Sequence, residues 1–166
     1  MLTLNLAAKL AGSVLLFASA FAFNLKNGRR DRERLRRLSA QIAFVRFARD
    51  RIERFLSPIG EIIRDCDGAV ISDMLLGCEE IGFHDIESLR AVLRGGEYYS
   101  DGGAAFDAFL SELGTSYREE EVAACNACIK DTEALLGKLG TELPKERKSR
   151  GVLSLCLAAA IVIILF

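Results

Sequence analysis

Residues and motifs of the common enzyme classes are scarce in this sequence. It contains one histidine, His84, which stands in a loop-like run without a partnered nucleophile. It has no phosphate-binding loop, zinc-protease motif, nucleophile elbow or dinucleotide-binding fingerprint. Alternation of apolar and polar residues over a useful length, which is typical of β-strands, is also missing. These absences argue against an enzyme and against a β-sheet fold.

The cysteines do not form the pattern of an extracellular disulfide framework. There are five, at positions 66, 78, 125, 128 and 156, and Cys156 lies inside an apolar run. An odd number of cysteines, with one of them in an apolar run, favours reduced thiols. The Cys125-x-x-Cys128 pair would lie on one face of a helix, where it could bind a metal or act as a redox pair. No second pair accompanies it, so packing is the preferred interpretation, and a membrane-anchored redox or metal-binding protein is the alternative.

Each end of the chain is apolar. Residues 10–23 carry no charge, and with residues 2–6 the run approaches the ~20 residues that cross a bilayer. Residues 151–166 are apolar on every face, although a helix of this length rises only about 24 Å. We therefore predict a transmembrane anchor in residues 1–25 and another in residues 151–166, with a helical domain in residues 26–150.

Basic residues follow the first apolar run and precede the second. Because positive charge resists translocation, both clusters predict that the central domain stays in the cytoplasm and that both termini lie outside. A cleaved signal peptide is the competing interpretation, since Ala18-Ser19-Ala20 has the form of a cleavage site. The predicted membrane-proximal basic collar consists of Lys26, Arg29, Arg30, Arg32, Arg34, Arg36, Arg37, Lys145, Arg147, Lys148 and Arg150.

The central region is acidic, because residues 57–144 carry six Lys/Arg against eighteen Asp/Glu. This charge favours a partner with a basic surface. Lipid headgroups are the nearest anions for the collar, so we expect no nucleic acid. Since the sequence has no cofactor-binding motif, we also expect no cofactor.

Two long amphipathic helices are predicted within residues 26–150. Ser57-Pro58 interrupts the first, and Pro144 ends or kinks the second. The fold class expected is all-α, an elongated antiparallel helical hairpin or bundle with a transmembrane helix at each end. The apolar seams that pack the two helices are expected at Leu35, Leu38, Ile42, Val45, Ile52, Leu56 and Ile59, and at Val122, Cys125, Ile129, Leu136, Leu139 and Leu143.

The order of these features resembles the stage III sporulation protein AB family of endospore-forming bacteria. The matching pieces are LRRLSAQIAFVRFARDRIERFLSPIGEII (residues 35–63), LSELGTSYREEEVAACNACIKDTEALLGKL (residues 110–139) and KERKSRG before the terminal anchor. Ser57-Pro58-Ile59 with Glu61, and then Leu113-Gly114, look like the family's most recognisable motifs at helix breaks. Glu121 stands where the family often has glutamine, and residues 68–104 match poorly.

This resemblance implies a non-enzymatic component of the transenvelope complex between mother cell and forespore. The family is similar to the inner-membrane platform protein of type II secretion systems. The expected partners are the lipid bilayer, other membrane subunits and the cytoplasmic ATPase of the complex. The expected location is the outer forespore membrane, with the helical domain on the mother-cell side.

Overall fold

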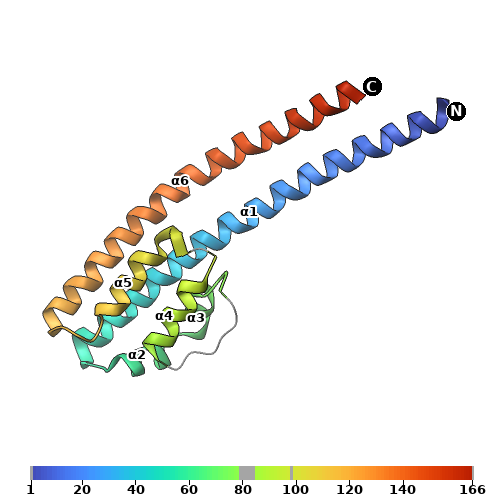
Figure 1. Ribbon diagram of the computed structural model, residues 1–166. Coiled ribbons are helices and arrows are strands. Elements are labelled where there is room, and N and C mark those ends of the chain that lie inside the picture. The colour runs from blue at the N-terminus through green and yellow to red at the C-terminus, as the bar shows by residue number, and fades with distance from the viewer. Residues whose placement is uncertain (1, 79–84, 98, 166) are drawn as a thin grey trace. The chain divides into compact units, whose positions relative to one another are not determined.

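The computed structural model describes residues 2–78, 85–97 and 99–165, with the side chains of residues 11–78, 85–97, 99, 100 and 102–163. The chain is all-helical and has no strand within these ranges, which confirms the all-α part of the predicted fold class (Figure 1). His84 lies outside the described residues. The elements are α1 (Leu2–Phe55), α2 (Ile59–Asp65), α3 (Gly68–Met74), α4 (Ile86–Gly95), the π-helix η1 (Tyr99–Gly103), α5 (Ala104–Glu112) and α6 (Arg118–Leu165).

The chain forms two compact units. Unit 1 contains residues Met1–Arg32 and Gly140–Phe166, and unit 2 contains Glu33–Leu139. The predicted boundaries after residue 25 and before residue 151 stay predictions, and α1 and α6 each continue without a break through them.

Unit 2 has a hydrophobic core between its segment of α1, its segment of α6 and the short helices. The rings of Phe44 on α1 and Phe106 on α5 meet edge-on, with their centroids 6.1 Å apart, and Phe106 stacks on Phe109. The two long segments run antiparallel, since Arg46 bonds to Glu133 and Arg49 to Asn126. Most of the predicted seam is buried or partly buried here: Leu35, Leu38, Ile42, Val45, Ile52, Ile59, Val122, Cys125, Ile129, Leu136 and Leu139.

Leu56 is the exception in the seam. The prediction that it packs is wrong: its side chain is 68% exposed. The helical spacing fails at this position because α1 ends at Phe55 and Leu56 adopts φ +52°, a left-handed conformation. Pro58 has an extended backbone, with φ −62° and ψ 148°, and is the residue just before α2. The predicted interruption at Ser57-Pro58 is confirmed.

Pro144 does not end the second long helix, which corrects one of the two outcomes expected for it. The helix α6 runs through Pro144 from Arg118 to Leu165. Proline removes one backbone hydrogen bond and strains the preceding turn by about 3 kcal/mol. Buried Leu143 on one side and the apolar run from Gly151 on the other favour helix beyond that penalty.

A buried carboxylate joins the short helices of unit 2. Asp107 of α5 accepts hydrogen bonds from Arg90 Nε at 2.7 Å and Arg94 Nε at 2.9 Å, both on α4, and from the Tyr99 hydroxyl of η1 at 3.2 Å. Asp85 caps α4, with a reciprocal bond to Ser88. These hydrogen bonds hold α4, η1 and α5 together.

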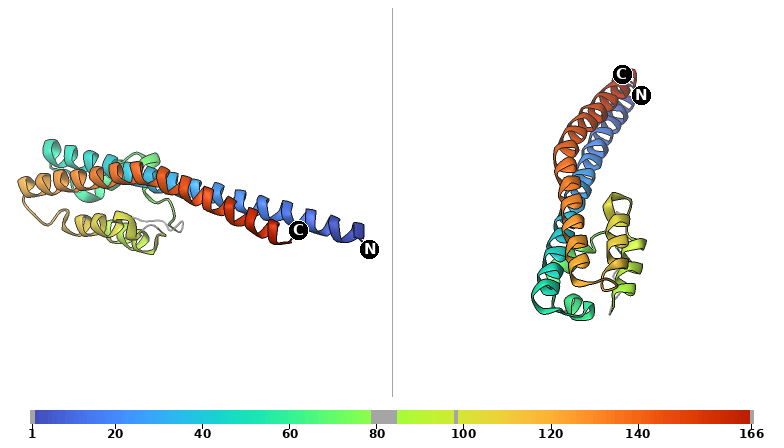
Figure 2. Two further views of the ribbon diagram at one scale, coloured as in Figure 1. Left: turned by 90° about the horizontal axis from the view of Figure 1, so that it is seen from above. Right: turned by 90° about the vertical axis from the view of Figure 1, so that its left-hand side faces the viewer.

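Unit 1 consists of the first part of α1 and the last part of α6, which run antiparallel and side by side (Figures 1 and 2). Among the helical residues whose side chains are described, no stretch is long and apolar enough to cross a membrane. The described apolar stretches, residues 11–25 and 151–163, each rise only about 20 Å, against ~30 Å of hydrocarbon. The predicted transmembrane character of residues 1–25 and 151–166 is thus not confirmed. Parts of both predictions, residues 1–10 and 164–166, lie outside the described side chains.

Candidate functional surfaces

Unit 1 exposes large apolar side chains on both of its helices. Leu15 is 70% exposed on α1 and Leu153 is 73% exposed on α6. Soluble proteins rarely expose contiguous apolar surface on this scale without a partner for it. The apolar surface of unit 1 is defined by Val14, Leu15, Phe17, Phe21, Phe23, Leu25, Val152, Leu153, Leu155, Leu157, Ile161 and Ile163.

In the apolar part of unit 1, residues 11–25 and 151–163, the buried or hydrogen-bonded side chains between the two helices are small or polar. The Asn24 amide donates a 3.0 Å hydrogen bond to Ser154 Oγ, and Ser154 in turn donates to the Gly151 carbonyl. Ser13 and Ala158 are buried, with 8% and 5% of their surface exposed. This part of unit 1 therefore has the inverse of the usual distribution, with polar and small residues inside and large apolar residues outside. Helices that pack against each other in lipid use small residues and polar contacts in this way.

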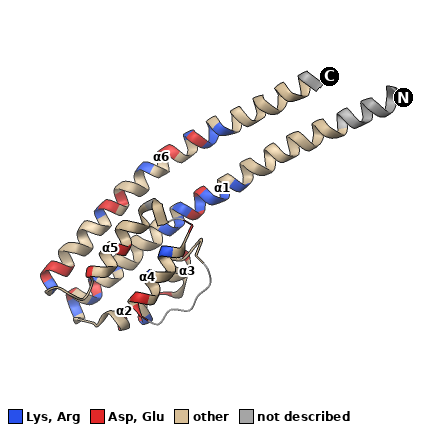
Figure 3. Ribbon diagram, in the orientation of Figure 1, with Lys and Arg blue, Asp and Glu red and all other residues tan. Residues whose placement is uncertain are grey.

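The predicted basic collar is divided between the two units. In unit 1, Lys and Arg residues directly follow the apolar run of α1 and directly precede that of α6 (Figure 3). In unit 2, Arg36 pairs with Asp73 of α3 at 2.6 Å, and Arg37 is buried. Arg37 therefore corrects the prediction, because it is enclosed in the helical core and does not present its charge at a surface. Sequence reasoning missed this, since Arg37 stands in a segment rich in arginine.

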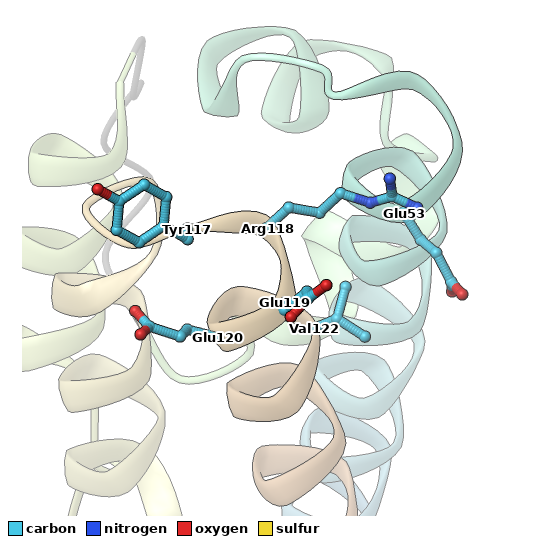
Figure 4. Close-up of a pocket in the computed structure, with 6 residues that line it drawn as sticks. All are labelled: Glu53, Tyr117, Arg118, Glu119, Glu120 and Val122. Carbon is cyan, nitrogen blue, oxygen red and sulfur yellow. The ribbon is translucent and has the colours of Figure 1, made fainter.

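Unit 2 has an acidic hollow at the start of α6. Its volume is about 720 Å³, and Glu53 of α1, Tyr117, Arg118, Glu119, Glu120 and Val122 line it (Figure 4). Arg118 extends toward α1, the helix that carries Glu53. Tyr117 is 84% exposed. The acidic residues suit the positive end of the helix dipole, so they also stabilise α6 without any partner.

The acidic hollow was only partly foreseen from the sequence. The acidic charge of residues 57–144 predicted its sign, whereas Glu53 lies outside that range and joins it through the fold. Tyr117 carried no signal of its own in the sequence.

All five cysteines are free thiols, and four of them, Cys66, Cys78, Cys125 and Cys128, lie in environments that disfavour the thiolate. Burial raises the pKa of Cys125 to about 11, with smaller upward contributions from Cys128 and Glu121. Burial also raises the pKa of Cys66, Cys78 and Cys128. Because the thiolate is the nucleophile and the metal ligand, these environments oppose the redox and metal alternative.

The residues at these surfaces come from segments far apart in the chain. Among the described side chains, no group of three or more His, Cys, Asp or Glu residues is placed to hold a metal ion. No family model, no curated protein and no solved structure matches this chain.

Proposed function

We propose that this chain is a non-enzymatic, membrane-anchored assembly protein. The two helical segments of unit 1 insert into a lipid bilayer, and unit 2 remains in the cytoplasm and binds partner subunits. The observation that carries this proposal is the inverted distribution in unit 1. Each large apolar side chain moved from water into hydrocarbon contributes about 1.5–3 kcal/mol, so the exposed set strongly favours insertion.

The sequence beyond the described side chains supports a span of sufficient length. Leu2, Leu4 and Leu6 precede the apolar surface of α1, and Ile164, Leu165 and Phe166 follow that of α6. With these residues the first run reaches the ~20 residues of a membrane-crossing helix. The second is shorter, and local thinning of the bilayer accommodates it.

Labelling of single cysteines tests the insertion and its direction. In a background without native cysteines, Thr3→Cys reports the N-terminus and Ser116→Cys reports unit 2. We expect a membrane-impermeant maleimide to label Thr3→Cys in intact cells, and Ser116→Cys only after permeabilisation. Labelling of Ser116→Cys in intact cells overturns the topology, and release of the chain by alkaline carbonate overturns insertion itself.

The docking role of unit 2 rests on its charge. The acidic hollow offers three carboxylates beside an exposed tyrosine, a surface complementary to basic and aromatic groups. For the full chain in detergent, Glu119→Lys with Glu120→Lys should abolish salt-sensitive binding to partner subunits. The matched variant Glu61→Lys with Asp131→Lys makes the same charge change on exposed positions outside the hollow. Equal loss in both variants, or loss in neither, counts against the hollow as the docking site.

The biological setting follows from the resemblance to the stage III sporulation protein AB family. We propose that the partners are the membrane subunits and the cytoplasmic ATPase of the complex between mother cell and forespore. The location is then the outer forespore membrane, with unit 2 on the mother-cell side. Deletion of the gene should stop spore formation after engulfment begins, and normal spore yield in the deletion strain would contradict this setting.

A further inference from the structure

Unit 1 brings together two basic clusters that are far apart in the sequence. A Cβ placed on Gly28 of α1 would lie only 2.7 Å from Arg147 Cζ of α6, so this guanidinium rests directly on the α1 backbone. One to two turns away, the Asn24–Ser154 hydrogen bond joins the same two helices. The residues that surround the contact are exposed and form what we call the cationic belt: Lys26, Arg29, Arg30, Arg32, Lys145, Arg147, Lys148 and Arg150.

The belt has a large excess of positive charge. Its eight cations stand against Asp31, Glu142 and Glu146 in the same stretches of unit 1, which leaves a net charge of +5. Arg150 pairs with Glu146 at 2.8 Å, and pairing of this kind does not change the sum. Because the Gly28–Arg147 contact holds both clusters within about one Debye length, ~10 Å, their repulsion is not fully screened by salt. A polyanionic surface facing the belt removes this repulsion.

The apolar surface begins where the belt ends. On α1, exposed Leu25 precedes Lys26, and on α6, exposed Val152 and Leu153 follow Arg150 and Gly151. The Asn24–Ser154 pair lies at this boundary. A soluble anion or a nucleic acid would satisfy the cations but leave the neighbouring apolar side chains in water. An anionic amphiphile, with its charge at one end and its hydrocarbon at the other, satisfies both.

We propose that the cationic belt binds the phosphate headgroups of anionic phospholipids, so that this anchor selects anionic lipids from a mixed bilayer. The selection rests on the insertion proposed above, because it requires the apolar surface to lie in the same leaflet. A lysine or arginine held at an anionic membrane surface contributes about fivefold to the lipid association constant. The belt therefore both fixes the depth of the anchor and enriches the lipid around it.

Lipid captured with the protein provides the test. The full chain is reconstituted into vesicles in which about one lipid in five is phosphatidylglycerol and the rest is phosphatidylcholine. Polymer-bounded nanodiscs are then cut from the vesicles and isolated through a tag on the chain, and their lipid composition is measured by mass spectrometry. We expect phosphatidylglycerol to be enriched at least twofold over the bulk, with the enrichment lost at about 0.5 M salt, where screening is strong.

Two sets of variants separate the belt from general positive charge. Lys26→Gln, Arg32→Gln, Lys145→Gln and Lys148→Gln together remove four belt charges from exposed positions. Arg54→Gln, Arg64→Gln, Arg118→Gln and Lys130→Gln remove four charges from exposed positions of unit 2. The belt variant should lower the enrichment to that of the bulk, and the unit 2 variant should leave it unchanged.

The outcomes distinguish this inference from the proposed function. Nanodiscs that contain the chain but have the bulk lipid composition overturn the selection and leave insertion standing. Equal effects of the two variant sets also overturn it. A chain that never enters the vesicles refutes the insertion itself. Circular dichroism of each variant in detergent confirms that it has kept its helices.

Discussion

The side chain of Ile59, at the start of α2, lies against Gly114 in the loop between α5 and α6 and leaves no room for a Cβ there. Gly114 also has φ +86°, a conformation that glycine adopts without strain. The contact closes unit 2 at the end where α1 stops and α6 begins. Both residues belong to the short helix-break motifs that were quoted for the family resemblance.

Gly114→Ala should destabilise unit 2 by about 2–4 kcal/mol. The new methyl group would collide with Ile59, and alanine disfavours a positive φ. Gly137→Ala is the matched control, since nothing lies within 4 Å of that position and it is exposed in the interior of α6. Alanine should stabilise the control by about 0.5–1 kcal/mol. Thermal unfolding of the full chain in detergent measures both, and a neutral Gly114→Ala would show that the loop rearranges freely.

Gln41→Leu should raise the stability of unit 2. The Gln41 side chain is 1% exposed, and neither its amide oxygen nor its nitrogen has a hydrogen-bond partner among the described residues. A buried amide without partners loses about 1–3 kcal/mol of hydration, which leucine of similar volume does not. Chemical denaturation should therefore shift to higher denaturant, whereas Gln41→Glu should shift it lower by burying a charge. A destabilised leucine variant would indicate an internal partner such as bound water.

Cys125 should resist alkylation in the folded chain. With a pKa of about 11 in place of 9.0, its thiolate is roughly 100-fold scarcer near pH 8 than that of an ordinary cysteine. Mass spectrometry after iodoacetamide treatment should find Cys125 modified only when denaturant is present. Rapid modification in the native chain would return the redox and metal alternative to consideration.

The same thiol should make the chain less stable in alkali. The raised pKa means that the unfolded chain releases this proton first, so stability falls as the pH rises from about 9 toward 11. Cys125→Ala should show a weaker decline over that window in a series of unfolding curves. An unchanged pH profile in Cys125→Ala would mean that other groups cause the decline.

Acid should destabilise unit 2 partly through Asp107. Burial raises the pKa of this carboxyl, but the hydrogen bonds and positive charges of Arg94 and Arg90 together lower it by more. The pKa of Asp107 therefore lies below its usual 3.8. A lowered pKa contributes stability above about pH 4 that is lost as the pH falls through the folded value. Asp107→Asn should be less stable at pH 7 and lose less on acidification, while Asp131→Asn, an exposed control on α6, should behave as the unaltered chain does. If the stability of Asp107→Asn and that of Asp131→Asn fall equally as the pH is lowered, the Asp107 cluster does not cause the acid destabilisation.

Local pattern in the sequence determined which segments are helical and where most of them begin and end. The spacing of Ile42, Val45 and Ile52 predicted the buried face of α1, and Ser57-Pro58 predicted the break between α1 and α2. These features depend on a few neighbouring residues, so they can be read along the chain. The segregation of charge and of apolar runs was likewise complete in the sequence.

Only the tertiary structure decided which polar residues lie inside and which distant residues meet. Arg37 and Gln41 are buried although both are residue types usually found at the surface, and Leu56 is exposed although its spacing fits the seam. The contact of Arg147 with Gly28, which assembles the cationic belt, joins positions more than a hundred residues apart. Such outcomes depend on how whole helices pack, because burial and close approach are properties of several segments together and no local pattern encodes them.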